Sequence, residues 1–132
     1  MAKLNKIINE LAELLSSDSI SIHPKALEEF KSLVFGSGRE DSVLKILSKN
    51  LNLLTSCTPA EINRLSNFEI LRNSHGLRSM HIPDDSLYIR MLYKYYNGYV
   101  FLCAFHERND SRNTSYQPYI EIAHQRFIEI KE

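Results

Sequence analysis

The chain has little of several features that mark particular classes of protein. It has two cysteines, Cys57 and Cys103, which lie far apart and form no CxxC or Cys/His ligand spacing. This usage favours a reducing, cytoplasmic compartment over a disulfide framework. Its 16 basic and 16 acidic residues cancel. A net charge of zero argues against a surface that clamps nucleic acid all round, and it leaves room for a local basic patch.

Long apolar runs and the short motifs of common enzymes are also absent. No run approaches the roughly 18 residues needed to span a bilayer, and acidic and polar residues occupy the amino terminus where a signal peptide has an apolar centre. These absences predict a soluble, cytoplasmic protein with no membrane partner. No GxGxxG, P-loop or GxSxG pattern occurs. The five histidines show no ligand spacing, so we expect no metal and no cofactor.

The first part of the chain predicts helices and one short strand. Leucine and other apolar residues recur at three- and four-residue spacing through three segments, which is typical of amphipathic helices. We place these helices at residues 3–15, 24–35 and 39–54. A short strand at residues 20–22 precedes the second helix, and the second and third helices predict a helical hairpin. Thr58 and Glu61 form a capping-box pair before one short helical turn.

From Phe68 onward the apolar period changes from about 3.6 to about 2, which indicates strands. We place the strands at residues 68–72, 76–82, 87–95 and 99–106. Asn97-Gly98 joins the last two strands as a hairpin turn, and a closing helix follows Pro118. The predicted fold is therefore α+β: a small antiparallel sheet of about four strands packed against a helical hairpin, with an extra N-terminal helix and a C-terminal helix.

Alternation divides the side chains of the second and third of these strands between two faces. His81 and Arg90 fall on the outer face, and they are neighbours across the ladder if the two strands pair. The residues assigned to the core are Met80, Ile82, Ile89 and Met91. The register with the last strand is open. A two-residue turn sets Arg90 opposite Phe105 and puts His106 on the other face, whereas a longer turn changes that pairing.

Short motifs follow one another in the second half of the chain. Gly76-Leu77 opens a strand that ends in a basic and an apolar residue, and an arginine-bearing strand and an apolar strand follow. Next come Phe105-His106-Glu107-Arg108 and a helix with Ala and Arg three apart, at residues 121–126. Together with the order strand, two helices and strands, these motifs resemble the RelE/ParE superfamily of toxin–antitoxin toxins. The resemblance runs from about Ile20 to about Arg126, so residues 1–18 would be a helical extension and 19–132 a RelE-like toxin domain.

The resemblance implies a toxin that cuts mRNA, commonly in the ribosomal A site, without a metal. Its implied partners are mRNA, the ribosome and a cognate antitoxin that holds it inactive. Two positions depart from the family pattern: His81 stands where Arg is usual, and Glu107 replaces the first of two lysines. Because both changes remove positive charge, the alternative is a non-catalytic inhibitor of the same fold, either gyrase-directed or an inactive interaction module.

RNA cleavage by the 2′-hydroxyl needs a base, a cation and an acid. Arg90 is the candidate cation, because a guanidinium grips two phosphate oxygens and stays charged. The other interpretation of Arg90 is a surface residue paired with a carboxylate. His81 and His106 are candidates for the acid or the base, and Glu107 is a candidate base. A structural histidine and a solvated charged cluster are the corresponding alternatives.

Other basic and aromatic residues are candidates for binding RNA. Arg108, Arg78 and Arg126 would hold phosphates, with Arg126 facing solvent from the closing helix, and Tyr116 and Tyr119 would stack on a base. The N-terminal helix must have its apolar face covered. Its own domain, an antitoxin or a second copy in a homodimer would each cover it.

Overall fold

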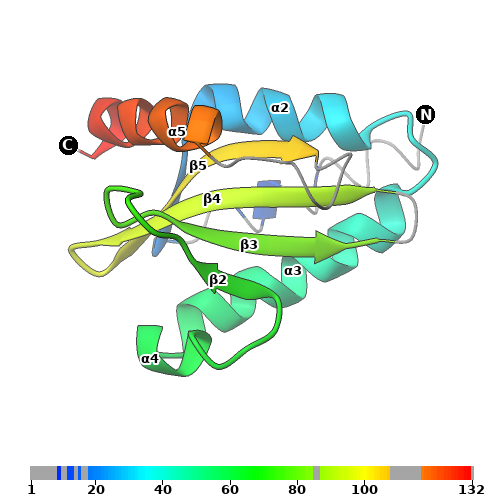
Figure 1. The fold of residues 1–132 in the computed structure, drawn as a ribbon. Coiled ribbons are helices and arrows are strands. Elements are labelled where there is room, and N and C mark those ends of the chain that lie inside the picture. The colour runs from blue at the N-terminus through cyan, green and yellow to red at the C-terminus, as the bar shows by residue number, and fades with distance from the viewer. Residues whose placement is uncertain are drawn as a thin grey trace.

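The computed structural model describes residues 18–84, 87–107 and 117–131, together with Asn9, Ala12, Glu13 and Leu15. The elements follow one another along the chain as shown in Figure 1. They are β1 (Ile20–Ile22), α2 (Pro24–Val34), α3 (Glu40–Ser56), α4 (Pro59–Ile62), β2 (Phe68–Ile70), β3 (Arg78–Pro83), β4 (Tyr88–Tyr96), β5 (Tyr99–Glu107) and α5 (Gln117–Ile130). The order of helices and strands is the one that the sequence periodicity predicts.

The fold is α+β, but the sheet differs from the expected one. Within the described residues it has five strands, in the order β1-β5-β4-β3-β2. It is mixed, because β1 runs parallel to β5 while the other three pairs are antiparallel. The prediction of about four antiparallel strands is therefore wrong in number and in pairing. A three-residue strand whose partner lies far along the chain has no hairpin to fix its direction.

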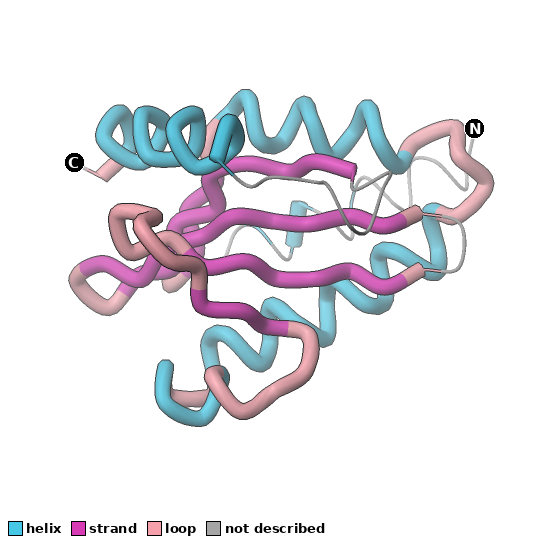
Figure 2. Tube along the Cα trace, viewed as in Figure 1, coloured by secondary structure: helices cyan, strands magenta, loops and turns pink. Residues whose placement is uncertain are grey.

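Helices cover both faces of the sheet (Figure 2). α2 lies against β5 and α3 against β3 on one face, so the two helices cover different strands of that face. α5 covers β5 and β4 on the opposite face. The core is accordingly divided into a larger cluster beneath α2 and α3 and a smaller one beneath α5. We call these the α3 face and the α5 face.

Strand alternation explains which residues enter the larger cluster. Met80 and Ile82 of β3 and Ile89 and Met91 of β4 are fully buried on the α3 face, as predicted. Each is flanked by residues that point to the α5 face, where Leu77, Leu92 and Ala104 pack beneath α5. Beyond these apolar residues the α5 face carries the polar side chains of His81, Arg90 and His106.

Local capping interactions fix where the helices begin. His23 precedes α2, and its Nδ1 accepts the backbone N–H of Lys25 at 3.0 Å. Its Nε2 therefore carries the proton and donates it to Glu129 Oε1 of α5 at 2.7 Å. Thr58 and Glu61 form the predicted capping box at the start of α4. His23 thus links the first turn of α2 to the last turn of α5.

The predicted helix over residues 3–15 falls largely outside the described residues. Its described positions are helical, and Leu15 packs against the larger core cluster. The division of the chain at residues 18 and 19 stays a prediction. Among the helices in the described ranges, none has the length and apolar character needed to cross a membrane.

Candidate functional site

A bulge in β5 decides which side chains share the α5 face. The β4–β5 turn has two residues, Asn97 and Gly98, with φ of 51° and 82°, and Tyr96 lies opposite Tyr99. This turn alone would pair Arg90 with Phe105. The register shifts instead, because Cys103 is an extra residue between Leu102 and Ala104 and has no partner on β4. Arg90 consequently lies opposite His106.

His81, Arg90 and His106 form a row across three neighbouring strands. His81 of β3 lies opposite Arg90 of β4, as predicted, and Arg90 lies opposite His106 of β5. Directly opposed residues point to the same face, with Cβ atoms about 5 Å apart. The three side chains therefore stand side by side on the α5 face. We call them the polar row.

His81 is held by contacts on both its backbone and its side chain. Its backbone N–H donates to Asn67 O at 2.7 Å, and its carbonyl accepts from Asn50 Nδ2 of α3 at 3.1 Å. Its Nε2 lies 3.2 Å from Glu69 Oε1 on β2. A carboxylate at this distance stabilises an imidazolium. His81 is thus a histidine with a fixed position and a partner for its charged form.

Arg90 occupies the middle of the polar row. Its side chain is half-buried, and its Nε lies out of solvent with no hydrogen-bond partner among the described residues. A guanidinium has five N–H donors in a planar fork, and it binds two oxygens of one anion side by side. This donor therefore lies between the two histidines without a partner among the described residues.

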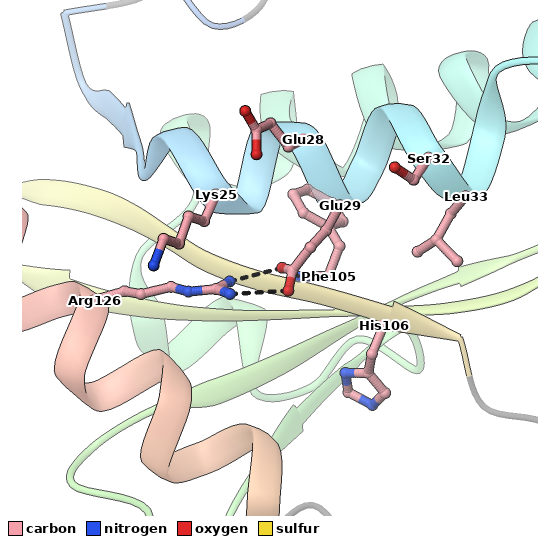
Figure 3. Close-up of a pocket in the computed structure, with 8 residues that line it drawn as sticks. All are labelled: Lys25, Glu28, Glu29, Ser32, Leu33, Phe105, His106 and Arg126. Atoms are coloured by element: carbon pink, nitrogen blue, oxygen red, sulfur yellow. Dashed lines mark hydrogen bonds and ion pairs between the residues drawn. The ribbon is translucent and has the colours of Figure 1, made fainter.

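His106 is nearly buried, with 5% of its surface exposed. The ring of Tyr119 in α5 stacks on it at 3.8 Å between centroids and 8° between planes. On its other side His106 lines a shallow cleft of about 480 Å³ between α2 and α5 (Figure 3). The cleft is otherwise lined by residues of α2 and by Phe105 and Arg126.

The same cleft contains an ion pair that closes the edge of β5. Arg126 of α5 donates to both carboxylate oxygens of Glu29 in α2, at 2.7 and 3.0 Å. Glu29 also accepts the backbone N–H of Phe105 at 3.0 Å, and Arg126 donates to Cys103 O at 3.1 Å. The Arg126 side chain is 12% exposed. The prediction that Arg126 faces solvent is therefore wrong, because its charge is used within the protein.

Four other predicted residues lie away from the polar row or outside the described part of the chain. Glu107 lies opposite Ile89 and so shares the α3 face with that core residue. Arg78 also points to the α3 face, where it contacts Asn63 and lies over the ring of Tyr95 at 5.2 Å. The structure does not bring either side chain beside Arg90. Arg108 and Tyr116 lie outside the described residues.

The thiol of Cys103, at the bulge, is unreactive near neutral pH. Burial raises the pKa of its thiol to about 12. The thiol therefore stays protonated near neutral pH and is a poor nucleophile. Within the described ranges, no three His, Cys, Asp or Glu side chains gather closely enough to hold a metal ion.

Sequence reasoning missed two residues beside the polar row. Glu69 lies on a short edge strand, and its contact with His81 depends on the β2–β3 register. Tyr88 begins β4 and shares the face of Arg90, two residues along the strand. Strand alternation from Arg90 was the signal that could have found Tyr88.

A comparison of the chain with models of known protein families and with curated proteins finds no match. The fold and the site define an α+β protein that carries an arginine between two histidines on one sheet face.

Proposed function

We propose that this protein is the toxin of a toxin–antitoxin system and acts as a metal-independent endoribonuclease on mRNA, in the manner of the RelE/ParE superfamily. The observation that carries the proposal is the polar row, in which Arg90 lies between His81 and His106 on one face of the sheet. The order of strand, two helices, meander and closing helix supports it as well. The predicted partners are mRNA on the ribosome and an antitoxin.

The row offers the three groups that cleavage by the 2′-hydroxyl requires. Arg90 would bind the scissile phosphate and offset the charge that grows on it. His106, nearly buried and stacked on Tyr119, would take the proton of the 2′-hydroxyl. His81, beside Glu69, would donate a proton to the departing 5′-oxygen. With strands about 4.8 Å apart, the two histidines span about 10 Å across the phosphate.

Purified protein added to a translating extract, followed by mapping of mRNA 5′ ends, tests the proposal. We expect cuts with the wild type and at least a hundredfold slower cutting with Arg90→Ala, because the phosphate loses its cation. Arg90→Lys keeps the charge and loses the bidentate grip, so its rate should lie between the two. Arg64→Ala, at an exposed arginine on the loop before β2, is the matched control. Equal cutting by Arg90→Ala and the wild type would remove the row from the mechanism.

A non-catalytic inhibitor of the same fold is the second candidate. The position of Glu107 favours it, since this carboxylate lies on the α3 face and cannot act beside Arg90. The gyrase-directed version predicts intact mRNA and impaired DNA supercoiling in cells that express the protein. Intact mRNA with normal supercoiling would instead favour an inactive interaction module.

A further inference from the structure

Tyr88 is a large aromatic side chain exposed beside the polar row. It stands two residues before Arg90 on β4, so both side chains point to the α5 face. Its residue surface is 55% exposed. It lies opposite Pro83 of β3, which is also exposed. Tyr88 and Pro83 form the next cross-strand pair after Arg90 and His81 on this face.

The ring of Tyr88 lacks the ring contacts that other tyrosines make within the described part of the chain. No ring contact or hydrogen bond joins it to another described residue. By contrast, Tyr99, which is 49% exposed at the β4–β5 turn, packs its ring against Phe101 at 6.4 Å between centroids. Tyr119 stacks on His106, so its ring face is occupied. Tyr88 therefore offers a free aromatic surface next to the polar row.

The distance between Tyr88 and Arg90 matches the size of one nucleotide. Residues i and i+2 of a strand are about 7 Å apart, which is the reach of one nucleotide from its phosphate to its base. A guanidinium that holds a phosphate and an aromatic ring that stacks on a base are the two recurring elements of single-strand binding. An exposed ring with no ring contact or hydrogen bond among the described residues stands beside an arginine whose Nε also has no described partner, so this face provides both elements.

We infer that Tyr88 is the base-stacking residue of this site and holds the nucleobase next to the phosphate bound by Arg90. The inference rests on the proposed function for its ligand, single-stranded RNA, and it adds the residue that grips the base. Stacking makes no hydrogen bonds to the base edges, so Tyr88 should strengthen binding with little preference among bases.

A short RNA with 2′-O-methyl groups at every position tests the inference, because it cannot be cut by 2′-hydroxyl attack. One base is replaced by 2-aminopurine, whose fluorescence falls when it stacks, and the replacement is moved along the strand. With wild-type protein we expect quenching at one or two positions. Tyr88→Ala should abolish that quenching and weaken binding about tenfold, whereas Tyr88→Phe, which keeps the ring, should resemble the wild type.

Tyr99→Ala is the matched control, since Tyr99 is similarly exposed and lies at the far end of the same strand pair. It should leave both quenching and affinity unchanged. Wild-type quenching that persists in Tyr88→Ala, or no binding of the oligonucleotide by the wild type, would overturn the inference. Tyr88-dependent quenching without any cutting of mRNA would support the stacking role while the proposed ribonuclease activity falls. If Tyr88→Ala cuts mRNA at the wild-type rate and positions, the proposed ribonuclease activity stands and the stacking role of Tyr88 falls.

Discussion

At the scale of single residues, two histidines form a contact that should respond to pH. The rings of His75 and His124 stack at 3.7 Å between centroids and 9° between planes. Partial burial lowers the pKa of His124 below its usual value of 6.5, and the neighbouring His75, Lys94 and Lys131 lower it further, whereas Glu121 opposes them. His124 is therefore neutral in the folded protein at neutral pH.

This contact should make the protein less stable in mild acid. The unfolded chain binds a proton at His124 more readily than the folded one does, so stability is fully present above about pH 6.5 and falls as the pH drops through the lower folded value. His124→Gln removes this titration, and its urea midpoint should fall less between pH 7 and pH 5 than that of the wild type. Gln125→Ala, an exposed neighbour on α5, should keep the wild-type dependence. Parallel pH curves for wild type and His124→Gln would contradict this account.

Residue positions on strands were predictable from alternation alone. The burial of Met80, Ile82, Ile89 and Met91 and the opposition of His81 and Arg90 follow from a period of two once β3 and β4 pair. The place of His106 did not follow. An extra residue at Cys103 turns it to the face of Arg90, and nothing in the apolar run of β5 marks where that bulge falls.

At the scale of elements, the ion pair of Glu29 and Arg126 joins α2, α5 and the edge of β5. β1 pairs with β5 only at residues 100–102, so the strand edge beyond it needs other partners. Glu29 and Arg126 supply these partners to Phe105 N and Cys103 O. The ion pair therefore keeps the Phe105 N–H and the Cys103 carbonyl hydrogen-bonded, as backbone groups of a longer β1 would.

Removing Glu29 should therefore destabilise the fold measurably. Glu29→Ala leaves the guanidinium of Arg126 and the Phe105 N–H without their acceptor. Breaking a buried charged pair costs about 3 to 5 kcal/mol, and the partial exposure of Glu29 reduces the expected loss to about 2 kcal/mol. Urea unfolding followed by circular dichroism measures it. Glu28→Ala, at the exposed neighbour on α2, should change stability by less than about 0.5 kcal/mol. Equal midpoints for the two variants would show that the pair contributes little.

Arg126 also shows why element-level prediction has limits. Its place on the closing helix was predictable from the spacing of Ile120, Ala123 and Phe127, which are all buried. Its partner was not, because Glu29 lies 97 residues earlier on a different helix. Sequence spacing along a helix gives the face of a residue, whereas an ion pair between helices depends on how those helices pack.

At the scale of the whole molecule, zero net charge and a cationic site are compatible. The 16 basic residues are balanced overall, and in the structure Arg39, Arg78 and Arg126 have partners within the fold. Arg90 differs from these three, because its buried Nε has no hydrogen-bond partner among the described residues. Local geometry, and not the total charge, therefore identifies where an anion would bind.

The sheet topology could be predicted only in part. The meander of β3, β4 and β5 follows from strand periodicity and the Asn97-Gly98 turn. The parallel insertion of β1 at the edge of β5 is a long-range pairing of three residues, too short for periodicity to fix its partner or direction. Because β1 precedes α2 directly, this pairing also places α2 along β5 and so forms one wall of the cleft that His106 lines.

The chemical ends left on a cut RNA test the central claim most directly. The protein is incubated with a short RNA that carries one susceptible bond, found by the mRNA mapping, and the products are identified by mass spectrometry. Attack by the 2′-hydroxyl across the polar row predicts a 2′,3′-cyclic phosphate or 3′-phosphate on one fragment and a 5′-hydroxyl on the other. Both products should be lost in Arg90→Ala and when the 2′-hydroxyl is replaced by hydrogen. Fragments with 3′-hydroxyl and 5′-phosphate ends, or cutting that survives without the 2′-hydroxyl, would contradict the account.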